Sequence, residues 1–206
     1  MVLNMLMLNL PVEKIGGEMY ELLTMANRTT EDVFSLLDNL LKWTKSQIGN
    51  LNVVYQDVDA VEVVDSVIDV FNMVAGLKKI TIREEKPEKL PVCTDIDMLK
   101  TIIRNLLSNA IKFSNENSEV LVKMEEQGDT VVVSVKDSGC GIDEEGQQKL
   151  LHTDTHFSTF GTNNEEGSGL GLLLCQDFAV KIGGKLWFTS KEGEGSTFYF
   201  SIPLKK

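Results

Sequence analysis

The stretch "RNLLSNAIKFS", residues 104–114, carries two patterns on one expected helix. Asn105, Asn109 and Lys112 stand at i, i+4 and i+7 on one face of it. A solvated helix face is the ordinary interpretation of such a stripe. Glu, Lys and Gln are better helix formers than Asn on a solvated face, however, so two asparagines one turn apart favour a specific role. Apolar residues at helical spacing would line a core: Ile102, Ile103, Leu106, Leu107, Ala110 and Ile111.

Strands and helices are expected on both sides of this helix. Before it come "LNVVYQ" (51–56) as a strand, "AVEVVDSVIDVFNMVA" (60–75) as a helix and "KITIRE" (79–84) as a strand. The helix itself covers "TDIDMLKTIIRNLLSNAIKFS" (94–114), begun by a Thr or Asp cap. After it come the hairpin "EVLVKMEE" and "TVVVSVKD", a loop-rich stretch, the helix "GLGLLLCQDFAVKI" (169–182) and the strands "KLWFTS" and "STFYFSI". Because the elements do not alternate strictly as βαβ, the sequence predicts an α+β two-layer sandwich.

The N-terminal part has a different texture. From Glu18 to Gln47 the apolar residues step by threes and fours, a heptad seam broad enough for a helical bundle. An ordinary core helix is the other interpretation of this pattern. We place the domain boundary near Gly49 and Asn50, which gives a helical segment over 1–49 and a mixed domain over 50–206.

Charge and cysteine content limit the partners. The 206 residues carry a formal net charge of -11, so we expect no nucleic-acid partner, and a nucleotide ligand would need a metal ion and backbone N–H groups. Cys93, Cys140 and Cys175 lack metal-like spacing, as in a reducing compartment. The apolar opening, residues 1–10, is too short to span a bilayer and lacks signal-peptide features, so we expect no membrane segment in this chain and a cytoplasmic location.

Asp137 follows a strand whose alternate valines predict an inward face. Counting on by two places the Asp137 carboxyl on that same side, where it needs hydrogen-bond donors, and the amine of a bound heterocycle would supply one. Gly139 and Gly141 would let a flat ligand approach the backbone closely. An Asx turn that merely closes the strand is the alternative.

A glycine run precedes the next helix. "EEGSGLGL" has Gly167, Gly169 and Gly171 at every second position, and such a loop can wrap phosphate oxygens at a helix start. A flexible hinge is the alternative. The preceding "LHTDTHFSTFGTNN" (151–164) is long and polar, as a lid over a ligand would be. "GEGSTF" (193–198) alone predicts only a hairpin turn.

Taken in order, "NLLSNAIKFS", "DSGCGI", "STFGTNNEEGSGLGL" and "GEGSTF" resemble the ATP-binding domain of sensor histidine kinases. The superfamily includes gyrase, the Hsp90 chaperones and the MutL repair ATPases. The resemblance runs from about Thr94 to Pro203, and Glu18 to Gln47 looks like the second helix of the family's dimerization hairpin. It implies the Bergerat ATP-binding fold over 50–206 and, over 1–49, a partial hairpin without the acceptor His.

The resemblance implies roles on the asparagine face. Asn109 would coordinate Mg²⁺ through its side-chain oxygen, and Asn105 and Lys112 would face the phosphates as catalytic residues. The superfamily's hydrolases typically have a Glu base four residues before the metal-binding Asn. Here that residue is Asn105, which cannot take a proton, so phosphoryl transfer is favoured over hydrolysis.

The resemblance also implies the adenine and phosphate contacts. Asp137 would accept a hydrogen bond from the adenine amine, and Thr197 would sit at the adenine end. Gly139 and Gly141 would form the pocket wall. Backbone N–H groups of four residues would meet the phosphates: Gly167, Gly169, Leu170 and Gly171.

By resemblance, the chain is the Mg-ATP-binding region of a protein-histidine kinase that phosphorylates a His and then a response-regulator Asp, and forms a homodimer through its N-terminal helices. The family's acceptor His lies on the first hairpin helix, whereas this chain has only His152 and His156, in the expected lid. We therefore expect the acceptor outside this chain. The lid also departs from the family, since no Lys or Arg stands between Lys149 and Lys181 and Leu151 replaces a frequent Phe.

Two alternatives stay open. A regulatory or interaction module would bind nucleotide without kinase activity and would act through the helical seam. An ATPase coupled to conformational change is disfavoured by Asn105.

Overall fold

The structure, a computed structural model, describes residues 52–150, 161–162 and 169–204, together with six N-terminal positions: Thr30, Val33, Leu37, Leu40, Leu41 and Thr44. The chain divides into two compact units, Met1–Thr44 and Lys45–Lys206. All six N-terminal positions are helical, and the Thr44 hydroxyl lies 2.9 Å from the Leu40 carbonyl oxygen. The remainder of the helix expected over 18–47 lies outside the described residues.

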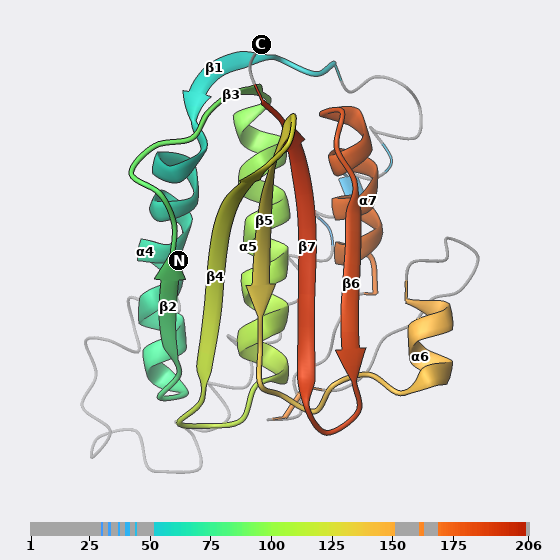
Figure 1. The fold of residues 1–206 in the computed structure, drawn as a ribbon. Helices are drawn as coiled ribbons and strands as arrows, with labels where there is room; N and C mark the ends of the chain where they lie inside the picture. The colour runs from blue at the N-terminus through green and yellow to red at the C-terminus, as the bar shows by residue number, and fades with distance from the viewer. Residues whose placement is uncertain are drawn as a thin grey trace. The chain divides into compact units, whose positions relative to one another are not determined.

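The larger unit is built on a five-stranded sheet in the order β2-β4-β5-β7-β6 (Figure 1). Its strands are β2 (Thr81–Glu85), β4 (Glu119–Gln127), β5 (Thr130–Lys136), β6 (Leu186–Lys191) and β7 (Gly195–Pro203). β2 and β4 are parallel, and the other neighbours are antiparallel. A second, two-stranded sheet pairs β1 (Gln56–Asp59) with β3 (Pro91–Thr94).

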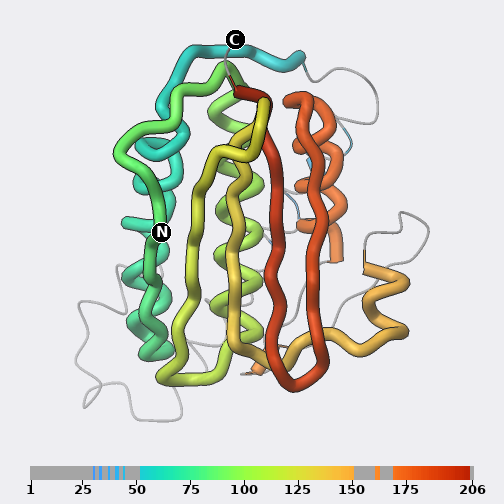
Figure 2. The backbone as a smooth tube through the Cα atoms, in the orientation of Figure 1, coloured from blue at the N-terminus to red at the C-terminus, as the bar shows by residue number. Residues whose placement is uncertain are grey.

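Helices cover one face of the large sheet, as Figures 1 and 2 show. They are α4 (Ala60–Leu77), α5 (Ile96–Phe113) and α7 (Gly171–Lys181). The short α6 (Glu144–Lys149) lies beyond the β6 edge of the sheet (Figure 1). The predicted α+β two-layer sandwich is confirmed.

The apolar stripe of α5 anchors the helix to the sheet. Its six predicted core residues are each at most 6% exposed. Fully burying a large aliphatic side chain stabilises a fold by roughly 1.5–3 kcal/mol, so this face fixes how α5 is rotated. The opposite polar face is thereby held in one orientation.

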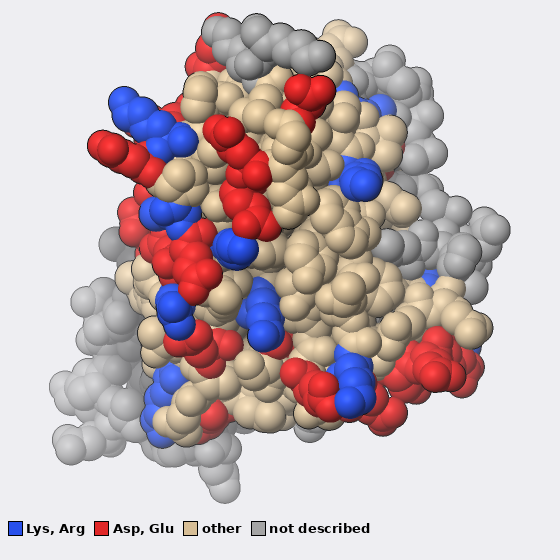
Figure 3. Space-filling view, in the orientation of Figure 1, with Lys and Arg blue, Asp and Glu red and all other residues tan. Residues whose placement is uncertain are grey.

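The two faces of the sheet differ in character. Val131, Val133 and Val135 are buried, and β7 pairs them with Ile202, Phe200 and Phe198 on the helix-covered face. The other face carries charged residues over β2 and β4 (Figure 3), including the exposed pairs Arg83–Glu85 and Lys123–Glu125. Such exposed pairs contribute little stability. The strand alternation therefore decides which side chains approach the helices.

Three elements differ from the sequence prediction. The prediction of a strand over 51–56 is wrong, since β1 occupies Gln56–Asp59. The Val54 N–H, within the predicted strand, donates instead to the Asp95 carboxylate at 2.9 Å. β3 was not predicted, because it pairs with a strand distant in the sequence. α6 was assigned to a loop, because six residues are too few to show a helical period. Among the helices of the described residues, none is long and apolar enough to cross a membrane.

Candidate functional site

Asp137 directly follows β5 on the helix-covered side of the sheet and is 4% exposed. Its Oδ1 accepts hydrogen bonds from the N–H groups of Gly139 at 2.9 Å and Ser196 at 3.2 Å. Burial raises the pKa of the Asp137 carboxyl, and these two N–H groups oppose the rise. Hydrogen bonds from the described residues reach Oδ1 only, so the backbone orients the carboxyl through one oxygen.

The turn after Asp137 is closely packed on both sides. A Cβ on Gly139 would lie 2.1 Å from the Phe113 carbonyl oxygen at the end of α5. A Cβ on Gly141, whose φ is +65°, would lie 2.0 Å from the Lys191 carbonyl oxygen in the β6–β7 hairpin. Backbone therefore meets backbone at both positions, and the glycines hold Asp137 between α5 and the hairpin.

The asparagine face of α5 is half-buried at Asn105, Asn109 and Lys112. The Asn105 side-chain Nδ2 donates to the Thr101 carbonyl oxygen at 2.9 Å. Its Oδ1 lies 2.6 Å from where a Cβ on Gly171 would stand, so this amide faces the first residue of α7. The predicted phosphate residues Asn105 and Gly171 are thus brought together.

The start of α7 has the geometry of an anion site. Gly169 has a φ of +67°, and the N-cap Leu170 provides no side-chain cap. The first N–H groups of a helix have no intrahelical acceptors and carry the positive end of the dipole. Beside Asn105 they can receive phosphate oxygens. Gly167 lies outside the described residues.

The other end of the α5 stripe lies against the Asp137 turn. The Lys112 ammonium lies 4.9 Å from the centre of the Phe113 ring, and the Cys140 N–H donates to the Phe113 carbonyl oxygen at 3.4 Å. One helix therefore borders the start of α7 near Asn105 and the Asp137 turn at its last residue. This arrangement assembles a polar strip between two predicted subsites.

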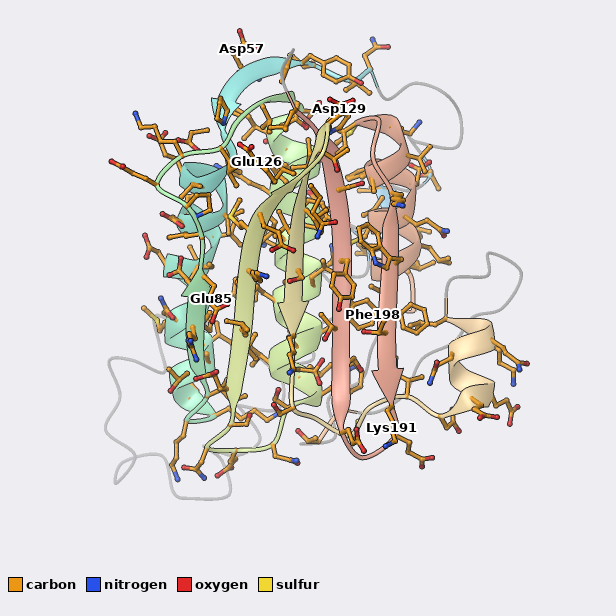
Figure 4. All side chains as sticks on the ribbon, viewed as in Figure 1. Asp57, Glu85, Glu126, Asp129, Lys191 and Phe198 are labelled. Atoms are coloured by element: carbon orange, nitrogen blue, oxygen red, sulfur yellow. The ribbon has the colours of Figure 1, made fainter. Side chains whose placement is uncertain are left out.

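Thr197 is not brought to Asp137. It pairs with Lys136 and Thr189, which places all three on the sheet face away from the helices. Figure 4 labels the next residue of β7, Phe198, which is buried on the helix-covered face. The strand parity of Thr197 therefore turns its side chain away from the Asp137 carboxyl, whereas the prediction that Thr197 sits at the adenine end stays a prediction.

Ser196 is the residue that the sequence prediction missed. Its N–H donates to Asp137, and its hydroxyl lies 2.9 Å from that of Ser190. Ser190 also accepts a hydrogen bond from the Ile142 N–H at 2.9 Å, so a hydroxyl pair joins the hairpin to the Asp137 turn. Counting back by two from Phe198 would have found Ser196.

The donor set fits a metal ion that arrives with phosphates. Asn109 offers one half-buried amide oxygen in the middle of the stripe. Within the described ranges no group of three or more His, Cys, Asp or Glu could hold a metal. Mg²⁺ usually takes one or two protein oxygens and completes its shell with water and substrate phosphates. Asn109 suits that mode of binding.

Residues 94–206 match the family described as Histidine kinase-, DNA gyrase B-, and HSP90-like ATPase. Because the match covers more than half of the chain, the chain belongs to this family. The fold and the site therefore define an ATP-binding domain.

Two relatives of known name are sensor kinases. The chain is 30% identical over 171 residues to the adaptive-response sensory kinase SasA of Rippkaea orientalis, a match that covers 82% of this chain and 43% of SasA. It is 28% identical to the sensor histidine kinase WalK of Bacillus subtilis over 89% of this chain and 30% of WalK. The chain thus spans less than half the length of these relatives.

Solved structures agree with this class. The catalytic domain of the histidine kinase ThkA superposes with a TM-score of 0.64 at 30% identity, covering 73% of this chain and 96% of that domain. Full-length ShkA, solved in complex with AMPPNP, has a TM-score of 0.74 at 22% identity over 93% of this chain and 40% of ShkA, which supports the fold alone. The domain is therefore of the histidine kinase catalytic type.

Proposed function

We propose that this chain is the Mg-ATP-binding catalytic region of a two-component sensor histidine kinase. It transfers the γ-phosphoryl group of ATP to a His outside this chain, and from there the group passes to an Asp of a response-regulator receiver domain. The observation that carries the proposal is the carboxyl of Asp137, buried and oriented through one oxygen at the end of the α5 stripe.

In this proposal the Asp137 turn binds the adenine base. Asp137 accepts a hydrogen bond from the exocyclic amine, which compensates its burial. Ser196, in place of Thr197, supports the carboxyl from the hairpin. Gly139 and Gly141 form the wall of the adenine pocket in this proposal, and a side chain at either position would collide with the backbone of Phe113 or Lys191.

In this proposal α5 and the start of α7 bind the phosphates. Asn109 ligates Mg²⁺, which when bound neutralises charge on the phosphates. Asn105 and Lys112 face the phosphates from the same stripe. Backbone N–H groups of the glycine run receive phosphate oxygens: Gly167, Gly169, Leu170 and Gly171.

Transfer is proposed over hydrolysis because of Asn105. Its amide group has no proton-accepting form in the physiological range, and its Nδ2 is already engaged with the Thr101 carbonyl. A water molecule beside it would lack a general base. The γ-phosphoryl group is therefore transferred to a stronger nucleophile, such as an imidazole, rather than to water.

A homodimer through the N-terminal helices is part of the proposal. Four described apolar residues of that unit are exposed in the single chain: Val33 (51%), Leu37 (51%), Leu40 (37%) and Leu41 (58%). They recur at heptad-like spacing, so a second copy of the same helix would cover them. Sedimentation of the chain beside a Leu37→Glu variant tests this, and a monomer at micromolar concentration would contradict it.

The test of the proposed function is nucleotide titration followed by phosphoryl transfer. Calorimetry with ATP and Mg²⁺ should give a saturable binding curve that Asn109→Leu weakens by about tenfold or more, since a leucine side chain has no oxygen to coordinate the metal ion. The matched control is Asn115→Leu, the same change at an exposed residue just beyond α5. We expect its affinity to equal that of the unmodified chain.

The second stage supplies labelled ATP and a separate acceptor helix that carries a His. We expect label on the added helix and none on this chain. ATP binding without transfer would favour the regulatory or interaction module, and label on His152 or His156 would refute an external acceptor. Absence of ATP binding at millimolar concentration would overturn the proposal as a whole.

A further inference from the structure

Lys78 is a buried lysine whose ammonium group reaches from the end of α4 to the end of α5. The residue is only 7% exposed. Its Nζ donates to the carbonyl oxygens of Ile111 at 3.0 Å and Lys112 at 2.8 Å, and to the Thr162 hydroxyl at 2.6 Å. Burying an ammonium is costly without such acceptors, and the end of α5 also offers the negative pole of the helix dipole.

Thr162 closes the same cluster from a distant part of the sequence. Its N–H donates to the Lys112 carbonyl oxygen at 3.2 Å. Its hydroxyl accepts from Lys78 and lies 3.1 Å from the Lys112 and 2.8 Å from the Ser114 carbonyl oxygen. Thr162 itself is thus tied to α5 through both its backbone and its side chain.

The end of α5 is therefore held by three other segments. Lys78 donates hydrogen bonds to the carbonyl oxygens of Ile111 and Lys112. Thr162 donates to those of Lys112 and Ser114, and the Cys140 N–H donates to that of Phe113. The last turn of a helix normally leaves such carbonyls to water or to its own cap. Here they fix the turn that carries the Lys112 side chain and borders the Asp137 turn.

We propose that Lys78 is a positioning residue for the triphosphate: its ammonium fixes the last turn of α5 against Thr162, and so holds Lys112 in register with the phosphates. The inference rests on the proposed function, because it assumes that nucleotide binds along α5. It adds a residue from outside the sequence motifs. Lys78 touches neither adenine nor phosphate and acts through the backbone of Lys112.

The test compares Lys78→Met with Lys79→Met. Both remove one lysine charge at adjacent positions, but Lys79 is exposed and forms a long ion pair with Glu116, at 3.9 Å. We expect Lys78→Met to bind Mg-ATP about tenfold or more weakly, because hydrogen bonds from a charged donor are lost. Its affinity for adenosine should change by less than about twofold. Lys79→Met should match the unmodified chain for both ligands.

A stability control separates positioning from folding. Val67→Ala in α4 removes buried methyl groups far along the helix from the ammonium, and Val67 is 5% exposed. We expect it to lower the unfolding midpoint while leaving the Mg-ATP affinity of the folded chain unchanged. All titrations are run at a temperature at which circular dichroism shows each variant folded.

Thr162 variants keep the inference testable if Lys78→Met does not fold, since Thr162 is exposed. Thr162→Val should weaken Mg-ATP binding about threefold, whereas Thr162→Ser should retain full affinity. In Lys78→Met combined with Thr162→Val, the losses should be less than additive, because the two side chains share a contact.

Some outcomes would overturn the role of Lys78: equal Mg-ATP affinity of Lys78→Met and Lys79→Met, equal losses for ATP and adenosine, or equal affinity of Thr162→Val and Thr162→Ser. Failure of the unmodified chain to bind ATP would instead refute the proposed function, and this inference with it. The two failures are therefore distinguishable in the same titrations.

Discussion

The two ends of α5 are closed in different ways. At the start, the Asp95 side chain caps its own helix, with Oδ1 accepting from the N–H groups of Asp97 and Met98 and Oδ2 from that of Val54. At the far end, three other segments hold the carbonyls, and the nearby Asp137 receives both of its hydrogen bonds on one oxygen. A buried acid with both oxygens engaged by backbone serves the fold, whereas one oriented through a single oxygen is suited to a ligand.

The largest expected effect is a loss of stability on removing the Asp95 carboxylate, a loss that we do not expect from a change at Asp137. Asp95→Ala should lower the free energy of unfolding by about 3 kcal/mol, because three backbone N–H groups lose a charged acceptor. For a chain of this length the melting temperature should fall by roughly 6–12 °C. Thermal melts followed by circular dichroism measure this. Mg-ATP affinity of the folded variant should not change, and a loss of affinity would mean that the helix start also belongs to the site.

The converse variant is Asp137→Asn. Its amide oxygen can still accept from Gly139 and Ser196, so the fold should be as stable as before at neutral pH. Its NH₂ group would face the adenine amine donor to donor, so Mg-ATP affinity should fall by roughly 100-fold. Calorimetric titration measures the loss. Unchanged affinity would remove Asp137 from the site and erase the contrast with Asp95.

A smaller effect distinguishes two neighbouring residues on opposite sheet faces. Ser196→Ala should weaken Mg-ATP binding about tenfold, because the hydroxyl pair with Ser190 beside Asp137 is lost. Thr197→Ala, one residue along and on the other face, should change affinity by less than about twofold. The reverse order in parallel titrations would restore Thr197 to the adenine end.

The smallest expected effect is on pH dependence. Burial raises the pKa of Asp137, so the folded chain holds this proton more tightly than the unfolded chain does. The resulting contribution to stability is full below the ordinary Asp pKa of about 3.9 and is lost as pH rises through the folded pKa. Urea unfolding should therefore show stability falling relative to Asp137→Asn on leaving the acid range, and a constant difference would contradict the cause assigned to the shift.

Local patterns carried much of the fold. The spacing of Leu106, Leu107 and Ile111 predicted α5, and Asp95 stands at its cap as one of the two expected residues. The hairpin of β4 and β5 also follows the prediction, with Gly128 at a φ of +63° in its turn. These elements depend on neighbours in the sequence, so their period and turn residues suffice.

The features that could not be predicted from the sequence depend on contacts between residues that are distant in it. No sequence motif singles out Lys78, and its ammonium group is buried only because α5 and Thr162 approach it. Asp137 and the glycines were predicted next to a ligand, but choosing Ser196 over Thr197 required strand parity to be followed through β7. The roles of all these residues remain predictions for the titrations above.

The sheet order has a consequence for the kinetics of folding. β4–β5 and β6–β7 are local hairpins, which form quickly, whereas β5 and β7 are separated by α6 and α7 and must find each other over a long loop. Asp137 directly follows the second strand of the β4–β5 hairpin, and Ser196 lies in β7 of the other hairpin. The contact between Asp137 and Ser196 therefore forms only after the two hairpins dock. If the proposed adenine site is right, nucleotide binding should appear during refolding only after that late step.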